Sequence, residues 1–282
     1  MTLNLRTNTF RRQLRSSSAI AALILMGLCC ASGSSLAAVD KSLPNGQMSA
    51  ESQREVAKLL GLALDAMKNG HPEVAVIHLK NAETIAPGDT TINMNLGEAL
   101  LGAGNPAEAA RELRSAIQRG APQAKVLPML YQAMLAQRQG QQLLNEFAEP
   151  SQDDHSELAA DTLRARAYAQ VQLGQKDEAA ATLDRALAIS RSARNLTARA
   201  QLAHDAGDDA LAAKFVDEAL AKEPANPSAL MIKVTLLQLA NKADQALGFA
   251  DTLVKETHNS SLARMARAGV YMQLKQDAKA LP

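Results

Sequence analysis

The feature that most constrains the fold is a repeat of about 34 residues that starts near Val56 and continues to the end of the chain. Within each unit, positions 8 and 20 are small or apolar, and position 15 is most often glycine. Units with this period bury their apolar faces only by stacking on their neighbours. The period therefore predicts an all-α solenoid of about seven helix-turn-helix units, the last one incomplete. The units begin at Val56, Thr90, Ala124, Ala160, Ala193, Pro227 and Ser261.

Each unit is expected to contain two antiparallel helices, A and B, joined by a tight turn. In unit one, Leu59, Leu62 and Ala66 share one face of helix A at helical spacing. Gly70 ends this helix, because glycine tolerates the left-handed conformation that closes a helix, and Pro72 opens helix B. Small residues at positions 8, 20 and 27 are expected to let the helices approach closely. Aromatic residues make up only 2% of the chain and apolar residues 47%, which favours such close packing.

The first 38 residues differ from the repeat and resemble the three parts of a secretory signal peptide. Four arginines and no acidic residue are followed by an apolar run, 19–31, and then by small residues, 32–38. The apolar run is too short to span a membrane comfortably. We expect cleavage after Ala37 or Ala38. The predicted organisation is a signal peptide over 1–38, a flexible lead over 39–55 and a solenoid over 56–282.

Removal of the signal would leave a mature chain without cysteine and with a small net charge. Both cysteines, Cys29 and Cys30, lie within it, so a chain cut after Ala37 has no disulfide, thiolate ligand or cysteine nucleophile. A lipid anchor on Cys29 or Cys30 is the alternative and would be the sole link to a membrane. Removal takes four of the 30 basic residues and none of the 29 acidic ones, so the mature net charge is −3. This charge gives no basis for binding nucleic acid.

No motif in the chain points to catalysis. The five histidines do not occur at metal-ligand spacing with a carboxylate, and neither a phosphate-binding glycine loop nor a nucleophile motif is present. The acidic run 153–157 follows Pro150 and is interpreted as the start of a helix, where acidic residues suit the helix dipole. We expect a protein that is not an enzyme, with no catalytic, cofactor or metal site and no small-molecule substrate.

The pattern resembles the tetratricopeptide repeat proteins. The resemblance is carried by the 34-residue period, by Leu62-Ala63 and Leu96-Gly97 at positions 7 and 8, by the alanines at positions 20 and 27, and by Pro87 and Pro224. It implies a right-handed α-solenoid that holds partners. Unit three departs from the pattern, since Leu143 takes position 20 and Pro150 takes position 27, so its helix B should be short or irregular, over 141–148.

In such a solenoid, positions 2, 5, 9 and 12 of the A helices should line a groove for a partner. The groove is apolar in unit one and polar in units four and five, a combination that suits an extended or helical peptide. The unit-one residues could instead pack against the lead segment. The candidate partner-binding residues are Leu60, Leu64, Arg164, Tyr168, Arg194 and Gln201.

A narrower resemblance involves the segments 75–82, 113–116 and 125–130. They are similar to the tetratricopeptide lipoproteins of exosortase (PEP-CTERM) and exopolysaccharide systems. The similarity implies a periplasmic or outer-membrane-associated scaffold that binds other envelope proteins or peptides in exopolysaccharide synthesis or export, or in surface-protein sorting. Two alternatives remain: a general envelope assembly factor for pili, secretins or cytochromes, and the regulatory part of an enzyme that continues past Pro282. The incomplete seventh unit likewise predicts that the solenoid continues, or that another chain covers its end.

Overall fold

The structure is a computed structural model. It describes residues 48–258 and 260–280, which form fourteen helices. The A helices of units one to seven are α1 (Ala50–Lys68), α3 (Thr90–Gly102), α5 (Gln123–Ala136), α7 (Glu157–Gln172), α9 (Ala193–Asp205), α11 (Pro227–Leu239) and α13 (Ser261–Gln273). The B helices are α2 (Pro72–Ile85), α4 (Pro106–Gln118), α6 (Gly140–Glu146), α8 (Lys176–Ile189), α10 (Asp209–Lys222), α12 (Ala243–Glu256) and α14 (Asp277–Ala280). The predicted signal peptide and its cleavage site lie outside the described residues.

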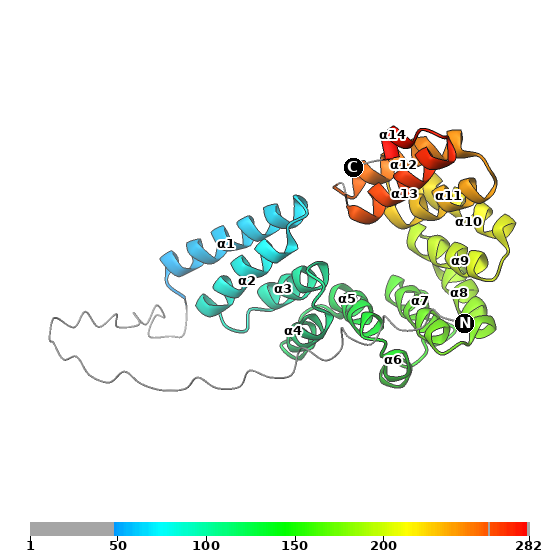
Figure 1. The fold of residues 1–282 in the computed structure, drawn as a ribbon. Coiled ribbons are helices and arrows are strands. Elements are labelled where there is room, and N and C mark those ends of the chain that lie inside the picture. Colours follow the sequence, from blue (N-terminus) through cyan, green and yellow to red (C-terminus); the bar gives the residue numbers. More distant parts are fainter. Residues whose placement is uncertain (1–47, 259, 281–282) are drawn as a thin grey trace, which may run out of the picture. The chain divides into compact units, whose positions relative to one another are not determined.

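The described helices confirm the all-α solenoid. Each A helix packs against the B helix of its own unit, and each B helix packs against the A helix of the next unit, so contacts follow the chain order (Figure 1). Among the described residues, no helix is both long and apolar enough to cross a membrane.

The small residues of the repeat lie where helices A and B meet. The alanine at position 20 is fully buried in units one, two, four, five and six, and Leu143 is equally buried in unit three. Position 27 is also a buried alanine in four units. Because alanine adds little beyond the backbone, the two helix axes can approach closely, and larger leucines fill the space around them. The buried alanines at position 27 are Ala82, Ala116, Ala186 and Ala219.

The turn between helices A and B is left-handed in all seven units, with or without glycine. Gly70 and Gly207 have φ angles of 75° and 84° at position 15. Arg138, Asn241 and Lys275 occupy the same position with φ of 56°. Side chains there cost roughly 1–2 kcal/mol each relative to glycine, so the packing of the two helices imposes the turn.

Six of the seven A helices are capped by a side chain at the N-terminus, and α5, which follows Pro122, is the exception. Ser49 Oγ accepts a hydrogen bond from the amide of Ser52 at 3.1 Å, and α1 therefore begins at Ala50, six residues before Val56. Residues 50–55 of the predicted lead are thus helical. Ser156 caps α7 in the same way, and Asp154 accepts from the amide of Ser156 at 3.0 Å, which lowers the pKa of Asp154. The interpretation of 153–157 as a helix start is confirmed.

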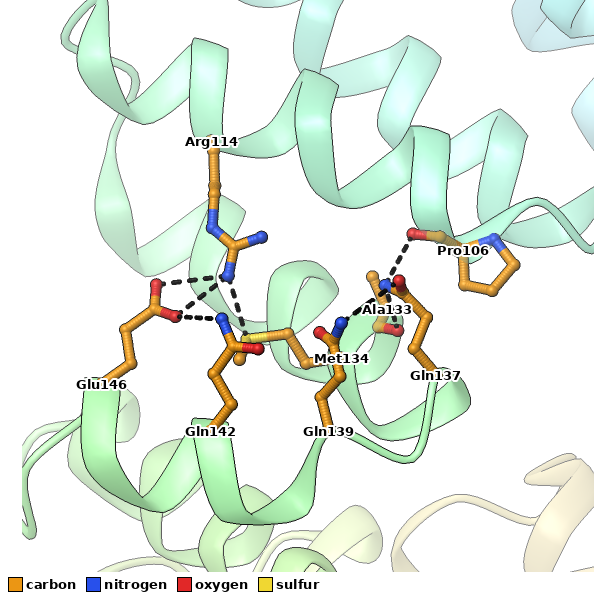
Figure 2. Close-up of polar contacts among 8 residues, drawn as sticks. All are labelled: Pro106, Arg114, Ala133, Met134, Gln137, Gln139, Gln142 and Glu146. Carbon is orange, nitrogen blue, oxygen red and sulfur yellow. Dashed lines mark hydrogen bonds and ion pairs between the residues drawn. The ribbon is translucent and has the colours of Figure 1, made fainter.

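Unit three has the short helix B that its sequence predicts, and polar contacts hold it in place. Figure 2 shows Arg114 of α4 reaching Glu146 of α6, with a nitrogen-to-oxygen distance of 3.0 Å. In the same view, Gln137 donates to the backbone oxygen of Pro106 at 3.2 Å and so links α5 to the preceding turn. Arg166 of α7 donates to the carbonyl of Phe147 at 2.6 Å, just past the end of α6. These contacts replace the packing that the missing half of the helix would supply.

In units two, three and five to seven, position 7 joins neighbouring units in two different ways, while Arg166 of unit four binds the end of α6. In units two and three it is a buried leucine, Leu96 or Leu130. In units five to seven it is a cation that pairs with an aspartate on the B helix of the preceding unit. The nitrogen-to-oxygen distances are 2.8 Å for Arg199–Asp184, 2.5 Å for Lys233–Asp217 and 3.5 Å for Arg267–Asp251.

Leu62, the position 7 residue of unit one, is exposed, although its spacing with Leu59 and Ala66 predicted a place on the buried face. The physical reason is that position 7 faces the preceding unit, and among the described residues no unit precedes α1. Lys58 and Asp65 occupy positions 3 and 10 on the same side of α1, where units two to seven have buried, uncharged residues. The outer side of unit one therefore carries two charged residues beside the exposed Leu62.

Candidate functional site

The A helices carry a row of side chains at positions 2, 5, 9 and 12, and several of these, such as Leu60 and Leu135, are partly buried against the core. Between α5 and α7 this A-helix face contains a pocket of about 390 Å³. Position 5, 9 and 12 residues of unit three and position 5 and 9 residues of unit four form much of its wall. The lining residues are Pro128, Tyr131, Gln132, Leu135, Ala136, Arg164, Ala165 and Tyr168.

Contacts of Tyr131 with Thr162 and Phe147 hold the inner side of the pocket in place. Tyr131 of α5 is buried, and its hydroxyl lies 3.1 Å from Thr162 Oγ1 of α7, so one hydrogen bond links the two helices. The Tyr131 ring also meets the Phe147 ring edge-on, with centroids 4.8 Å apart. An edge-to-face pair of this kind contributes roughly 0.5–1.5 kcal/mol beyond its buried area. Burial raises the pKa of Tyr131, which keeps its hydroxyl protonated.

Tyr168 is the aromatic side chain of the pocket that solvent reaches, with 38% of its surface exposed. Burial of the rest of the side chain raises the pKa of Tyr168, and the positive charge of Arg164 opposes part of this rise. The phenol therefore remains neutral at physiological pH and can both donate and accept a hydrogen bond. A ring with one apolar face and one polar tip is well suited to a binding surface.

Arg164 contributes to the pocket as a fixed wall. One terminal nitrogen lies 2.6 Å from Asp161 Oδ1, and it also donates to Asn195 Oδ1 of α9 at 3.0 Å. Only 15% of the arginine side chain is exposed. Because its charge is already paired, Arg164 cannot offer a strong site for a partner carboxylate without breaking these contacts.

The other predicted groove residues are spread over distant A helices. Leu60 is half-buried and packs against the apolar core of the first three units, while Leu64 is exposed on the same helix. On α9, Arg194 is exposed, and Gln201 donates to Asp205 Oδ1 at 2.8 Å. Among the six predicted residues, the structure places Arg164 and Tyr168 together in one pocket.

Sequence reasoning overlooked the unit-three side of this pocket. Pro128, Gln132 and Leu135 occupy positions 5, 9 and 12 of α5. The same positional rule that selected Arg164 and Tyr168 would have found them.

The described residues contain no group of three or more His, Cys, Asp and Glu side chains that could hold a metal ion. His204 Nδ1 lies 2.6 Å from Asp209 Oδ1 at the start of α10. The pair stands on the turn between the two helices, outside the residues that line the α5–α7 pocket.

Comparison with known proteins identifies the repeat. Residues 60–125 match the family profile of the tetratricopeptide repeat. A search of curated protein sequences finds no match. Among solved structures, TTC0263, a tetratricopeptide repeat protein of Thermus thermophilus, is 17% identical with a TM-score of 0.47, over 77% of this chain and 99% of that one. The pilF protein of Pseudomonas aeruginosa is 19% identical with a TM-score of 0.46, over 76% and 96%.

The Cut9–Hcn1 hetero-tetramer of the APC/C is 13% identical with a TM-score of 0.56, over 79% of this chain and 44% of that one. At this level of identity the similarity concerns the fold. The described part of the chain has the helix-turn-helix solenoid fold that the 34-residue period predicts, and residues 60–125 of it match the tetratricopeptide repeat.

Proposed function

We propose that this solenoid is a non-catalytic scaffold that holds a peptide segment of another protein across α5 and α7. The observation that carries the proposal is the pocket whose walls come from A-helix positions 5, 9 and 12, with the half-exposed ring of Tyr168 on one side. Binding sites of this kind are mostly apolar and carry a few placed polar groups. Here Pro128 and Leu135 supply apolar surface, while Gln132 and Tyr168 supply hydrogen-bonding groups.

The pocket chemistry suggests how a peptide would be held. An apolar side chain of the peptide would enter between Leu135 and Tyr168, and its removal from water would favour binding. The exposed amide of Gln132 and the neutral phenol of Tyr168 could each pair with the peptide backbone. Both charges nearest the pocket, Arg164 and Asp161, already neutralise one another. The site therefore favours an uncharged anchor residue.

We also propose that the protein is exported and acts in the bacterial envelope, in exopolysaccharide synthesis or export, or in surface-protein sorting. The basic, apolar and small-residue segments of 1–38 support export. The likeness of 75–82, 113–116 and 125–130 to exosortase-linked proteins supports the pathway. A general assembly factor for pili or secretins would share the same pocket and differ in its partner.

Photo-crosslinking in cells tests the proposal. A photoreactive residue at Gln132, on the pocket rim, should form an adduct with a component of the exopolysaccharide or sorting machinery. Adding Tyr168→Ala should reduce that adduct several-fold. The matched control carries the photoreactive residue at Ile77, which is exposed on α2 and far along the chain from the pocket. Identical adducts from both sites, or none from Gln132, would contradict peptide binding here. An adduct with a pilus or secretin component would select the alternative.

A further inference from the structure

Helix α13 carries a stripe of large apolar side chains that the described residues leave uncovered. Leu262, Met265 and Met272 are 65%, 70% and 59% exposed. Their spacing places them on one face of the helix, together with Gly269. They occupy positions 2, 5 and 12, so the stripe lies on the A-helix face of unit seven. Methionine is flexible and polarisable, and it suits surfaces that adapt to a partner.

The repeat shows what kind of element fits this stripe. In unit six, Met231 occupies the same position 5 as Met265. Met231 packs beside a cluster that includes Leu230 of α11 and Ala263 of α13. At this junction with the following unit, the position 5 side chain is therefore partly buried. On α13 the position 5 side chain, Met265, is 70% exposed, and the stripe is about ten residues long, roughly three helical turns, a length that a helix can match.

Arg264 indicates the charge that a helix covering this stripe should carry. It occupies position 4, which is buried and uncharged in each of the other six units. In unit seven this cation is exposed, and a terminal nitrogen lies 3.5 Å from Ser261 Oγ. Residues 260–276 contain three cations and no acidic residue; Arg267 pairs with Asp251 of α12, which leaves Arg264 and Lys275. A helix that covers this surface would bury or crowd the Arg264 charge, which is costly unless an acidic side chain faces it.

We propose that α13 docks an acidic amphipathic helix from a partner protein. Apolar side chains of the partner contact Leu262, Met265 and Met272, and its acidic side chains run along the edge marked by Arg264 and Lys275. A pocket of about 230 Å³ beside Arg264, Met265 and Lys279 continues this edge and has no acidic residue among its lining residues. The surface lies on a different unit from the α5–α7 pocket, so it is a second binding site.

A second copy of this chain fits the surface less well. Stacked as the next unit, its α1 would present Lys58 and Asp65 at positions 3 and 10. Those positions are buried and uncharged in units two to seven, where one unit stacks on another. A charged pair in that place opposes stacking, because both charges would lose water.

Fluorescence anisotropy with two synthetic helical peptides tests the proposal. Both peptides carry the same leucine stripe at i, i+3, i+7 and i+10, and their polar positions are glutamate in one and lysine in the other. The chain should bind the glutamate peptide at least tenfold more tightly than the lysine peptide. Met265→Asp and Met272→Asp should each weaken binding of the glutamate peptide about tenfold or more, and Arg264→Glu should reverse the preference. Ile77→Asp, at an equally exposed apolar residue (60%), is the matched control and should change nothing.

Equal binding of the two peptides, or insensitivity to all three α13 variants, would overturn the proposal. Two parallel measurements identify other occupants. Binding to phosphatidylglycerol vesicles that Met265→Asp abolishes, without peptide binding, would assign the stripe to a membrane surface. A concentration-dependent dimer that Met265→Asp dissociates would assign it to a second copy. Tyr168→Ala should leave peptide binding intact; loss of binding in this variant would move the peptide to the α5–α7 pocket.

Discussion

The junction between units four and five offers a quantitative test of how the C-terminal units are joined. Arg199 of α9 places Nε 2.8 Å from Asp184 Oδ1 of α8, and its guanidinium carbon lies 5.6 Å from the Phe215 ring centroid. The arginine side chain is mostly buried, whereas Asp184 is mostly exposed. The contacts of the arginine should therefore contribute more to stability than the charge of the aspartate.

The expected losses of unfolding free energy follow from this difference in burial. Asp184→Ala should cost less than about 1 kcal/mol, because its charge is screened by solvent. Arg199→Ala loses the same pair, a cation–π contact of roughly 0.5–1 kcal/mol and the packing of its aliphatic stem, so it should cost about 1–3 kcal/mol. Arg199→Leu installs the residue found at position 7 in units two and three. It should stay within about 1 kcal/mol of the native protein, because leucine can pack on Phe215 and Asp184 remains in water.

Urea denaturation of the single variants and of the double Arg199→Ala, Asp184→Ala variant measures the coupling energy of the pair. The coupling should be below about 1 kcal/mol and should shrink in about 1 M salt. Because repeat proteins can unfold in stages, hydrogen exchange of α8 and α9 amides supplies a local readout. If Asp184→Ala costs as much as Arg199→Ala, or if Arg199→Leu is as harmful as Arg199→Ala, the reasoning is refuted.

Four further outcomes are expected. Ala212→Leu should overpack the contact between α9 and α10 and cost about 1–3 kcal/mol, and Ala212→Glu should cost more; unchanged urea midpoints would contradict the register. Arg166→Ala should leave carbonyls at the end of α6 without a donor, cost about 1–3 kcal/mol and speed proteolysis within 147–156. Arg164→Ala should lower the thermal midpoint more than Tyr168→Ala does, since the arginine bridges α7 to α9 and the tyrosine ring is partly exposed. Intact-mass measurement of the envelope protein should give a chain that begins near Val39, and a mass that retains residues 1–30 would exclude cleavage.

Most of the fold could be predicted because the repeat encodes local geometry many times over. An alanine at position 20 and a glycine at position 15 mark a close helix contact and a left-handed turn, and both signals recur in several units. Arg138 has no such signal, yet its φ is 56°. The packing of α5 against α6 imposes that conformation, so it depends on neighbours and not on the residue itself. The start of α1 at Ala50 has a local cause instead, because the Ser49 cap extends the helix beyond the repeat pattern.

The site was predicted less completely, because its properties depend on contacts between units. Position alone placed Arg164 and Tyr168 on the same face of α7. It could not show that Asn195, on the next A helix, accepts a hydrogen bond from Arg164 and fixes it in place. The exposure of Leu62 could not be predicted for the same reason, because it depends on which unit precedes unit one. Side-chain freedom in a solenoid is decided by the neighbouring unit, and the sequence of one unit does not contain that information.

The α5–α7 pocket lies at the junction where the repeat departs most from its pattern. Because α6 ends at Glu146, α5 and α7 pack directly on each other more extensively than other neighbouring A helices do. In a solenoid, stability is roughly the sum of unit and junction terms, so a shortened helix B weakens its own junction. A peptide bound across α5 and α7 would add contacts to both sides of this junction and stabilise it by mass action. Partner binding should therefore slow hydrogen exchange in α6 and in residues 147–156, beyond the residues that touch the peptide. Protection confined to α5 and α7 would show that the pocket and the junction are independent.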